Sequence, residues 1–192
     1  ARGLLPHHYE KGWHPTATLG VFGATAAAAR MLDLDEEQMA MALAIAVSMA
    51  SGLKSNFGTP VKPMHVGHAA YNGIMAALVA QRGMTANPDA FEHQYGFFNL
   101  FNGAGTYDAD AILNGWDGPL EVLSPGIAIK QHPCCGSAHS AIDAALRIVA
   151  REGLLAADQI ARIEIRTHER RLAHTNRSAP RSGLDAKFSV QF

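Results

Sequence analysis

The sequence predicts a mainly α-helical fold, with an all-helical bundle domain over residues 1–125 and the start of an α+β domain over residues 126–192. Two patterns support this prediction. Apolar residues recur at helical spacing between capping residues and terminal glycines through most of the chain, whereas convincing β-branched alternation occurs only at Ile160–Thr167. The turn sequence Ser124-Pro125-Gly126 lies between the two patterns and marks the expected domain boundary.

The first two helices are expected within residues 18–52. Small residues dominate residues 18–32, and such a segment suits a helix that approaches its neighbours closely. Asp35 and Gln38 have the spacing of a capping box, so a second helix is expected to begin there and to run through Ser51. Gly52 follows as its stop.

The rest of the first domain is expected to hold a long helix and a short one. The long helix covers residues 65–82, with Gly83 placed for a left-handed C-cap. Residues 87–93 begin with Asn-Pro and indicate a short helix. An aromatic and glycine-rich segment then continues to Tyr107 as a lid-like or packing loop.

The second domain is expected to combine one helix with one strand. The helix runs from Ser137 to Arg151 and ends at Gly153. The strand covers residues 160–167, where Ile163 and Ile165 alternate with polar residues.

Composition and charge exclude several classes of protein. Lys plus Arg (16) nearly balance Asp plus Glu (17), so we expect neither nucleic acid nor a membrane surface as partner. No apolar run approaches the roughly 20 residues that span a bilayer, and no secretory signal pattern is present. The two cysteines, Cys134 and Cys135, are adjacent and are expected to be free thiols. A cytoplasmic protein is the expectation.

The two ends of the sequence suggest a piece of a longer protein. The chain begins at Ala1 without an initiator methionine, and it stops at Phe192 inside the apolar stretch 188–192.

The first of three candidate clusters surrounds His14, one of ten histidines, which is a high count for 192 residues. Pro15 restricts His14 to an extended conformation just before a helix whose N-terminal amides attract anions. His14 could act as an acid or base, or it could be a packing residue that is hydrogen-bonded to the next turn. The residues alone do not separate these two interpretations.

The second cluster contains Lys62, which precedes Pro63 at the start of the long helix. Lys62 could bind a carboxylate there, or it could be a solvated loop cation. His65 and His68 could share a helix face as metal ligands, but no carboxylate lies near them in the sequence and the cysteines lack the spacing of a tetrahedral site. We therefore expect no metal.

The third cluster, residues 128–139, precedes and enters the predicted helix of the second domain. Lys130 and the backbone amides at that helix start would bind a carboxylate, with Ser137 near the N-cap. Cys135 could be a nucleophile only if its thiol were strongly activated, so a packing role is the favoured interpretation.

Residues 12–20, 62–70, 130–139 and 187–192 together resemble, in order and spacing, the signature blocks of the MmgE/PrpD family, which includes 2-methylcitrate dehydratases and cis-aconitate decarboxylases. The resemblance implies a homodimeric enzyme without cofactor or metal that acts on a small polycarboxylate, and it makes the second domain an α+β lid domain. It places His14, Lys62 and Lys130 on catalytic positions, and the residues expected to bind substrate are Thr16, His65, Cys135, Ser137 and His139.

The reaction that this resemblance implies is elimination of water from a hydroxy tricarboxylate, as in a 2-methylcitrate dehydratase. Lys62 and Lys130 would hold carboxylates while His14 moves the proton. Cys135 stands where the decarboxylase branch has a histidine and Phe192 where it has a tyrosine, and both departures argue against decarboxylation. The resemblance also implies that an aspartate and a further histidine come from a preceding segment, so activity is expected of the full-length protein. Epimerisation, decarboxylation and a non-catalytic role in dimer assembly are the alternatives.

Overall fold

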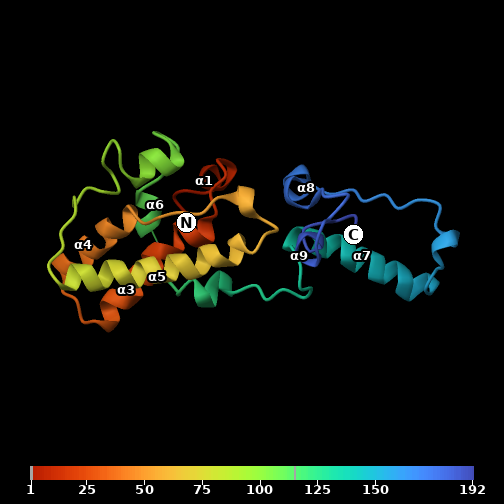
Figure 1. Ribbon diagram of the computed structural model, residues 1–192, viewed down its shortest axis with the longest axis horizontal. Coiled ribbons are helices and arrows are strands. Elements are labelled where there is room, and N and C mark those ends of the chain that lie inside the picture. The colour runs from red at the N-terminus through yellow and green to blue at the C-terminus, as the bar shows by residue number, and fades with distance from the viewer. Residues whose placement is uncertain (1, 115) are drawn as a thin grey trace. The chain divides into compact units, whose positions relative to one another are not determined.

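The computed structural model describes residues 2–114 and 116–192 (Figure 1). The chain divides into two compact units, Ala1–Gly118 and Pro119–Phe192. The mainly α fold class is confirmed, because helices form nearly all the regular structure of the described residues and the β pairing there is an isolated bridge between Trp13 and Leu53. The domain division at residues 125 and 126 stays a prediction.

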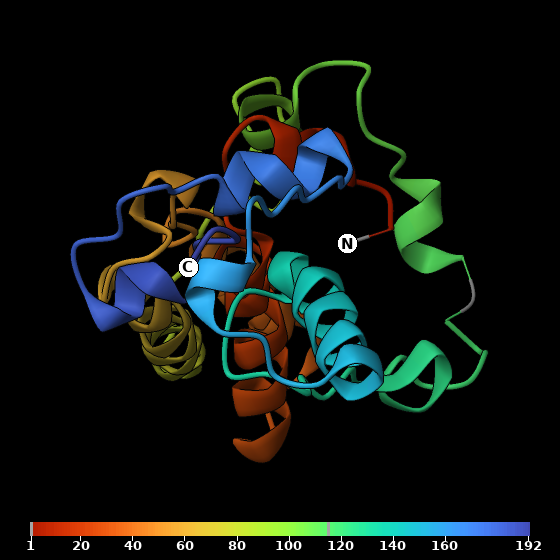
Figure 2. The ribbon, with the colours of Figure 1, turned by 90° about the vertical axis from the view of Figure 1, so that its right-hand side faces the viewer.

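Three helices form the centre of the first unit: α3 (Gly20–Met31), α4 (Glu36–Val47) and α5 (Val61–Gln81). They pack against one another along their lengths (Figures 1 and 2). The approach of α3 to α5 requires a glycine, because a Cβ at Gly73 would lie 2.6 Å from the Cβ of Ala24. The buried residues of this core are mostly small, namely Ala17, Val21, Ala42, Ile45, Ala46, Ala69, Ala76 and Ala80.

Two of the three capping predictions for these helices are confirmed, and two boundaries differ, since α4 ends early and α5 begins at Val61 rather than at residue 65. Asp35 Oδ1 accepts from the backbone N–H of Gln38 at 2.8 Å, which confirms the capping box. Helix α4 ends at Val47 rather than Ser51, with Ser48 as its C-cap, so the prediction that Gly52 stops this helix is wrong. Gly52 lies in the loop that follows, with a φ of +128°. Gly83 ends α5 in the left-handed region, as predicted.

Shorter elements and an aromatic cluster complete the first unit. The predicted helix at residues 87–93 is wrong, because Asn87 Oδ1 accepts from Asp89 N at 3.0 Å and the segment folds as consecutive turns. The following aromatic segment is a packing element, since Phe97 is only 1% exposed. The short elements are α1 (His7–Glu10), α2 (Pro15–Thr18), η1 (Lys54–Asn56), η2 (Phe98–Asn102) and α6 (Asp110–Leu113).

The second unit is built on one long helix, α7 (Gly136–Glu152), which ends at Gly153 as predicted and packs against α8. The predicted strand at residues 160–167 is wrong. A strand needs a neighbouring strand to satisfy its backbone groups, and nothing in the described part of the chain pairs with this segment, where Ile163 is 74% exposed. The remaining elements are η3 (Val122–Gly126), η4 (Ala157–Gln159), α8 (Glu169–Thr175) and α9 (Gly183–Ala186).

None of the helices within residues 2–114 and 116–192 has the length and apolar character needed to cross a membrane.

Candidate active site

His14 is held between two segments that are distant in the sequence. It directly precedes α2 with an extended backbone (φ −96°, ψ 96°), and Pro15 occupies the first helical position, as predicted. Its backbone N–H donates to the carbonyl of Gly52 at 3.0 Å. Only 5% of the residue is exposed, so the backbone and the side chain of His14 are both constrained.

The imidazole of His14 pairs with that of His65. Their Nδ1 atoms lie 3.2 Å apart. One of these nitrogens must carry the proton while the other presents a lone pair, because two lone pairs cannot form a hydrogen bond. When both rings are neutral, the pair therefore has one Nε2 that can accept a proton and one that can donate.

The surroundings of His14 favour its neutral form. Burial, together with the smaller effects of the Lys62 and His65 charges, lowers the pKa of His14 from its ordinary value near 6.5 to about 4. At neutral pH this imidazole is a proton acceptor rather than a donor. The sequence pattern could not reveal this shift, because the shift depends on burial.

Lys62 lies in the first turn of α5, which begins at Val61, and not in a loop before the helix as its sequence context suggested. Its side chain is half-buried, and its Nζ lies 5.0 Å from the centre of the Phe57 ring. The same Phe57 ring lies nearly perpendicular to the His14 imidazole, and the two ring centroids are 4.9 Å apart. Phe57 therefore contacts both the candidate base and the candidate carboxylate-binding cation.

Gly52 and Phe57 belong to this site although the sequence analysis did not single them out. A Cβ at Gly52 would lie 3.0 Å from the Cβ of Ala17 and 3.5 Å from the ring of His65, and the φ of +128° is unfavourable for other residues. The glycine after α4 was expected only as a helix stop. Its position beside His65 depends on how α4 and α5 pack.

Two further residues of the first unit lie close to the pair in the sequence. Thr16 is exposed on α2, and its role in substrate binding stays a prediction. His68 is exposed on α5, one turn beyond His65. Within residues 2–114 and 116–192 no three or more His, Cys, Asp or Glu side chains gather as metal ligands could.

The candidate residues of the second unit surround the start of α7. Cys135 is the residue just before the helix, and its backbone N–H donates to the carbonyl of Lys187 at 2.8 Å. Lys130 is exposed, and its Nζ donates to the carbonyl of Cys134 at 3.0 Å. Ser137, half-buried, occupies the first turn. The sequence prediction that these residues lead into a helix is confirmed.

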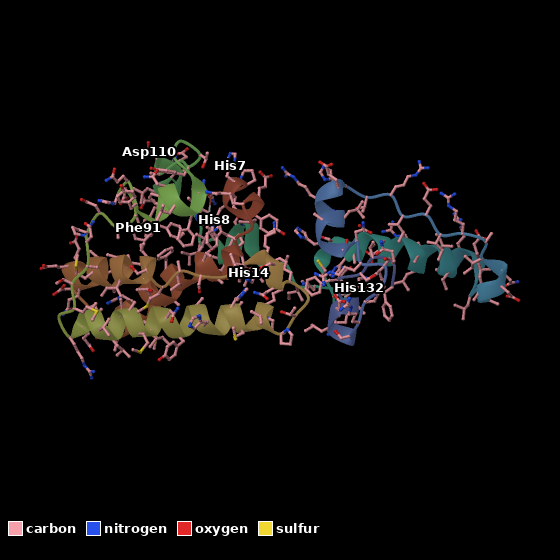
Figure 3. The ribbon with its side chains drawn as sticks, turned by 45° about the horizontal axis from the view of Figure 1, so that its top comes forward. His7, His8, His14, Phe91, Asp110 and His132 are labelled. Atoms are coloured by element: carbon pink, nitrogen blue, oxygen red, sulfur yellow. The ribbon has the colours of Figure 1, made fainter. Side chains whose placement is uncertain are left out.

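His139 and His132 form a second histidine contact in this unit, edge to face at a centroid distance of 5.1 Å. His132 Nε2 bonds to Asp143 Oδ1 at 2.8 Å, and Figure 3 labels His132 in this unit and His14 in the other. His139 Nε2 is buried and meets no hydrogen-bonding group among the described residues. Burial raises the pKa of the Cys134 thiol, as does Cys135 beside it, against the opposing charges of Lys130 and Lys187.

These features define a helical protein that carries a buried, neutral histidine paired with a second histidine and lying near a lysine in one unit, and a lysine shortly before a helix in the other. Residues 1–110 match the MmgE/PrpD N-terminal domain, and residues 132–192 match the MmgE/PrpD C-terminal domain. The chain belongs to the MmgE/PrpD family, and the resemblance of its sequence blocks is confirmed.

Several curated relatives carry the name cis-aconitate decarboxylase. The protein of that name from Homo sapiens is 32% identical over 186 residues, which cover 95% of this chain and 38% of that protein. The one from Aspergillus terreus is 32% identical over 139 residues, which cover 69% of this chain and 28% of the relative. The chain thus spans well under half the length of the relatives that it matches.

Proposed function

We propose that the full-length protein is a cofactor-independent lyase that acts on a small polycarboxylate, and that it eliminates water from a hydroxy tricarboxylate of the 2-methylcitrate type. The observation that carries this proposal is the His14–His65 pair, which holds a neutral imidazole in a buried position beside Lys62. Family membership and the names of the relatives support a lyase. We also propose that the protein acts as a homodimer.

Elimination of water begins when a base removes a proton from the carbon next to a carboxylate. When the Nδ1–H of His14 donates to His65, the Nε2 of His14 has a free lone pair. That lone pair accepts the proton from the substrate carbon. The C–H electrons become the C=C bond, and hydroxide leaves the adjacent carbon as water. The acid that supplies the proton to the leaving hydroxide is expected outside residues 1–192, as the family resemblance implies.

Charge grows on the substrate carboxylate as the proton leaves, so a fixed cation lowers the barrier. We assign this role to Lys62, because its ammonium is close enough to His14 to lower that residue's pKa. A bound polycarboxylate would act in the opposite direction and raise the pKa of His14 towards the working pH, where a general base is most effective.

The start of α7 supplies the second group of proposed binding residues. Lys130 and the first backbone amides of this 17-residue helix favour a carboxylate. Ser137 and His139 would orient it, and the buried Nε2 of His139 has no hydrogen-bonding partner among the described residues. Cys135 is assigned to substrate contact rather than to nucleophilic attack.

Decarboxylation is the second candidate reaction, and the names of the relatives favour it. Loss of carbon dioxide leaves a carbanion that must receive a proton. His14, neutral at pH 7, suits proton removal better than proton donation. Cys135 and Phe192, in place of the histidine and tyrosine of the decarboxylase branch, also support dehydration.

Ultraviolet absorption and proton NMR of the full-length protein with 2-methylcitrate, citrate and cis-aconitate would separate these reactions. An unsaturated tricarboxylate formed from 2-methylcitrate, in the presence and absence of a chelator, is the expected result. Carbon dioxide and an unsaturated dicarboxylate from cis-aconitate would instead establish the decarboxylase. Turnover of none of the three would contradict both.

A further inference from the structure

His8, in α1, is a fully buried histidine that the proposed reaction does not use. Its exposed fraction is 0%, and three aromatic rings surround it, those of Trp13, Phe97 and Phe101 at centroid distances of 6.3, 6.0 and 6.2 Å. Figure 3 labels His8 and His14 in the same unit. The Nε2 atom of His8 lies 2.7 Å from the hydroxyl oxygen of Thr18.

The proton positions along this contact follow from the next hydrogen bond. The Thr18 hydroxyl donates to the backbone carbonyl of His14 at 3.1 Å. A hydroxyl has a single proton, so the Thr18 oxygen can only accept from His8, and His8 must carry its proton on Nε2. The chain of donors therefore runs from His8 through Thr18 to the backbone of His14.

Packing alone does not explain a histidine at position 8. With the proton on Nε2, the Nδ1 atom of His8 holds a lone pair, and no described residue donates to this buried atom. A phenylalanine would fill an aromatic pocket without burying an unsatisfied acceptor. The remaining difference between the two side chains is the hydrogen bond that His8 donates to Thr18.

We infer that His8 is a positioning residue for His14: its Nε2–H directs the Thr18 hydroxyl onto the His14 carbonyl and thereby helps to fix the backbone from which the His14 imidazole meets His65. The His14 carbonyl also accepts from Thr18 N at 3.0 Å and Ala17 N at 2.9 Å. The backbone N–H of His14 donates to the carbonyl of Gly52. The turn is thus tied to α1 as well as to the segment after α4. His8 itself touches neither substrate nor the transferred proton.

This inference rests on the proposed function only where turnover is measured, so the test has two arms. The first follows the imidazole ¹⁵N shifts of His14 and their pH midpoint by NMR, without substrate. The second measures kcat and KM for the acid that the wild-type protein turns over. The variants are His8→Phe, which keeps the ring volume, and His8→Gln, whose side-chain amide can still donate to Thr18.

We expect His8→Phe to change the His14 shifts and to lower kcat about tenfold with little change in KM, since small displacements of a catalytic group are costly. His8→Gln should recover most of the loss. Thr18→Val should reproduce the effect of His8→Phe and Thr18→Ser should recover from it, which keeps the test decisive if one histidine variant fails to fold.

Unchanged His14 shifts in both His8→Phe and Thr18→Val would overturn the inference. It would also be overturned if the loss of kcat in each variant were proportional to its loss of melting temperature, because the effect would then be one of stability alone. A wild-type protein that turns over none of the acids would contradict the proposed function, while the NMR arm would still decide the role of His8.

Discussion

The Nδ1 atoms of His14 and His65 lie 3.2 Å apart although 51 positions separate the two residues in the sequence. This hydrogen bond joins the residue before α2 to the second turn of α5. The two Nδ1 atoms share one proton between them, and burial and the charge of Lys62 keep His14 neutral, so the pair can present a neutral imidazole nitrogen to a substrate proton.

Replacement of His14 by alanine should lower turnover by roughly 10²- to 10⁴-fold while the fold is retained, because general-base catalysis contributes this much. Steady-state kinetics of the full-length protein and its circular dichroism spectrum check the two parts of the prediction. His68→Ala is the matched control, since His68 is exposed on the same helix as His65. Near-normal turnover of the His14 variant would remove His14 from the mechanism.

Replacement of Lys62 by methionine should raise the pKa of His14, because the charge of Lys62 is one of the causes that lower it. NMR titration of the His14 imidazole measures this change directly. The same titration of the wild-type protein with citrate should also show a rise, since a bound anion stabilises the imidazolium. A His14 pKa that is unchanged in both experiments would show that the pair does not sense charge at this site.

Acid should destabilise the protein between about pH 6.5 and pH 4. Burial lowers the pKa of both His8 and His14 to about 4 in the folded state, whereas the unfolded chain titrates near 6.5. The unfolded state therefore binds protons first as the pH falls, and each histidine can remove up to about 3 kcal/mol of stability across this range.

Urea unfolding at pH 7, 5.5 and 4.5 measures this loss. His8→Gln removes one of the two titrating groups, so the free energy of unfolding of this variant should depend less steeply on pH than that of the wild-type protein. Carboxylates titrate equally in both proteins and cancel in the comparison. Identical slopes would mean that folding does not lower the pKa of His8.

Replacement of Gly52 by alanine should disturb the histidine pair as well as the backbone. The φ of +128° makes any other residue cost about 1–3 kcal/mol, and the new Cβ would lie 3.5 Å from the ring of His65. Gly83→Ala is the control, because Gly83 has a φ of +86° but open space around its Cα.

Both variants should lose stability in chemical unfolding, but only Gly52→Ala should change the His14 imidazole shifts. Equal shifts in the two variants would show that the close approach of Gly52 to His65 has no influence on the pair.

Local signals in the sequence determined the parts of the fold that depend on neighbours a few residues apart. The capping box of Asp35 and Gln38, the glycine ends of α5 and α7, and the extended backbone of His14 before Pro15 were all predictable, because each follows from steric or hydrogen-bonding effects within one turn of the chain. The family was predictable as well, since its blocks are contiguous segments.

Only the tertiary structure decided the rest. The segment at residues 160–167 has the composition of a strand, but strand formation requires a partner that its own residues cannot supply. The pairing of His14 with His65, the approach of Gly52 and the contact of His8 with Thr18 depend on how α1, α2 and α5 pack. The low pKa of His14 has the same origin, because burial is a property of the packed protein and not of any short stretch of sequence.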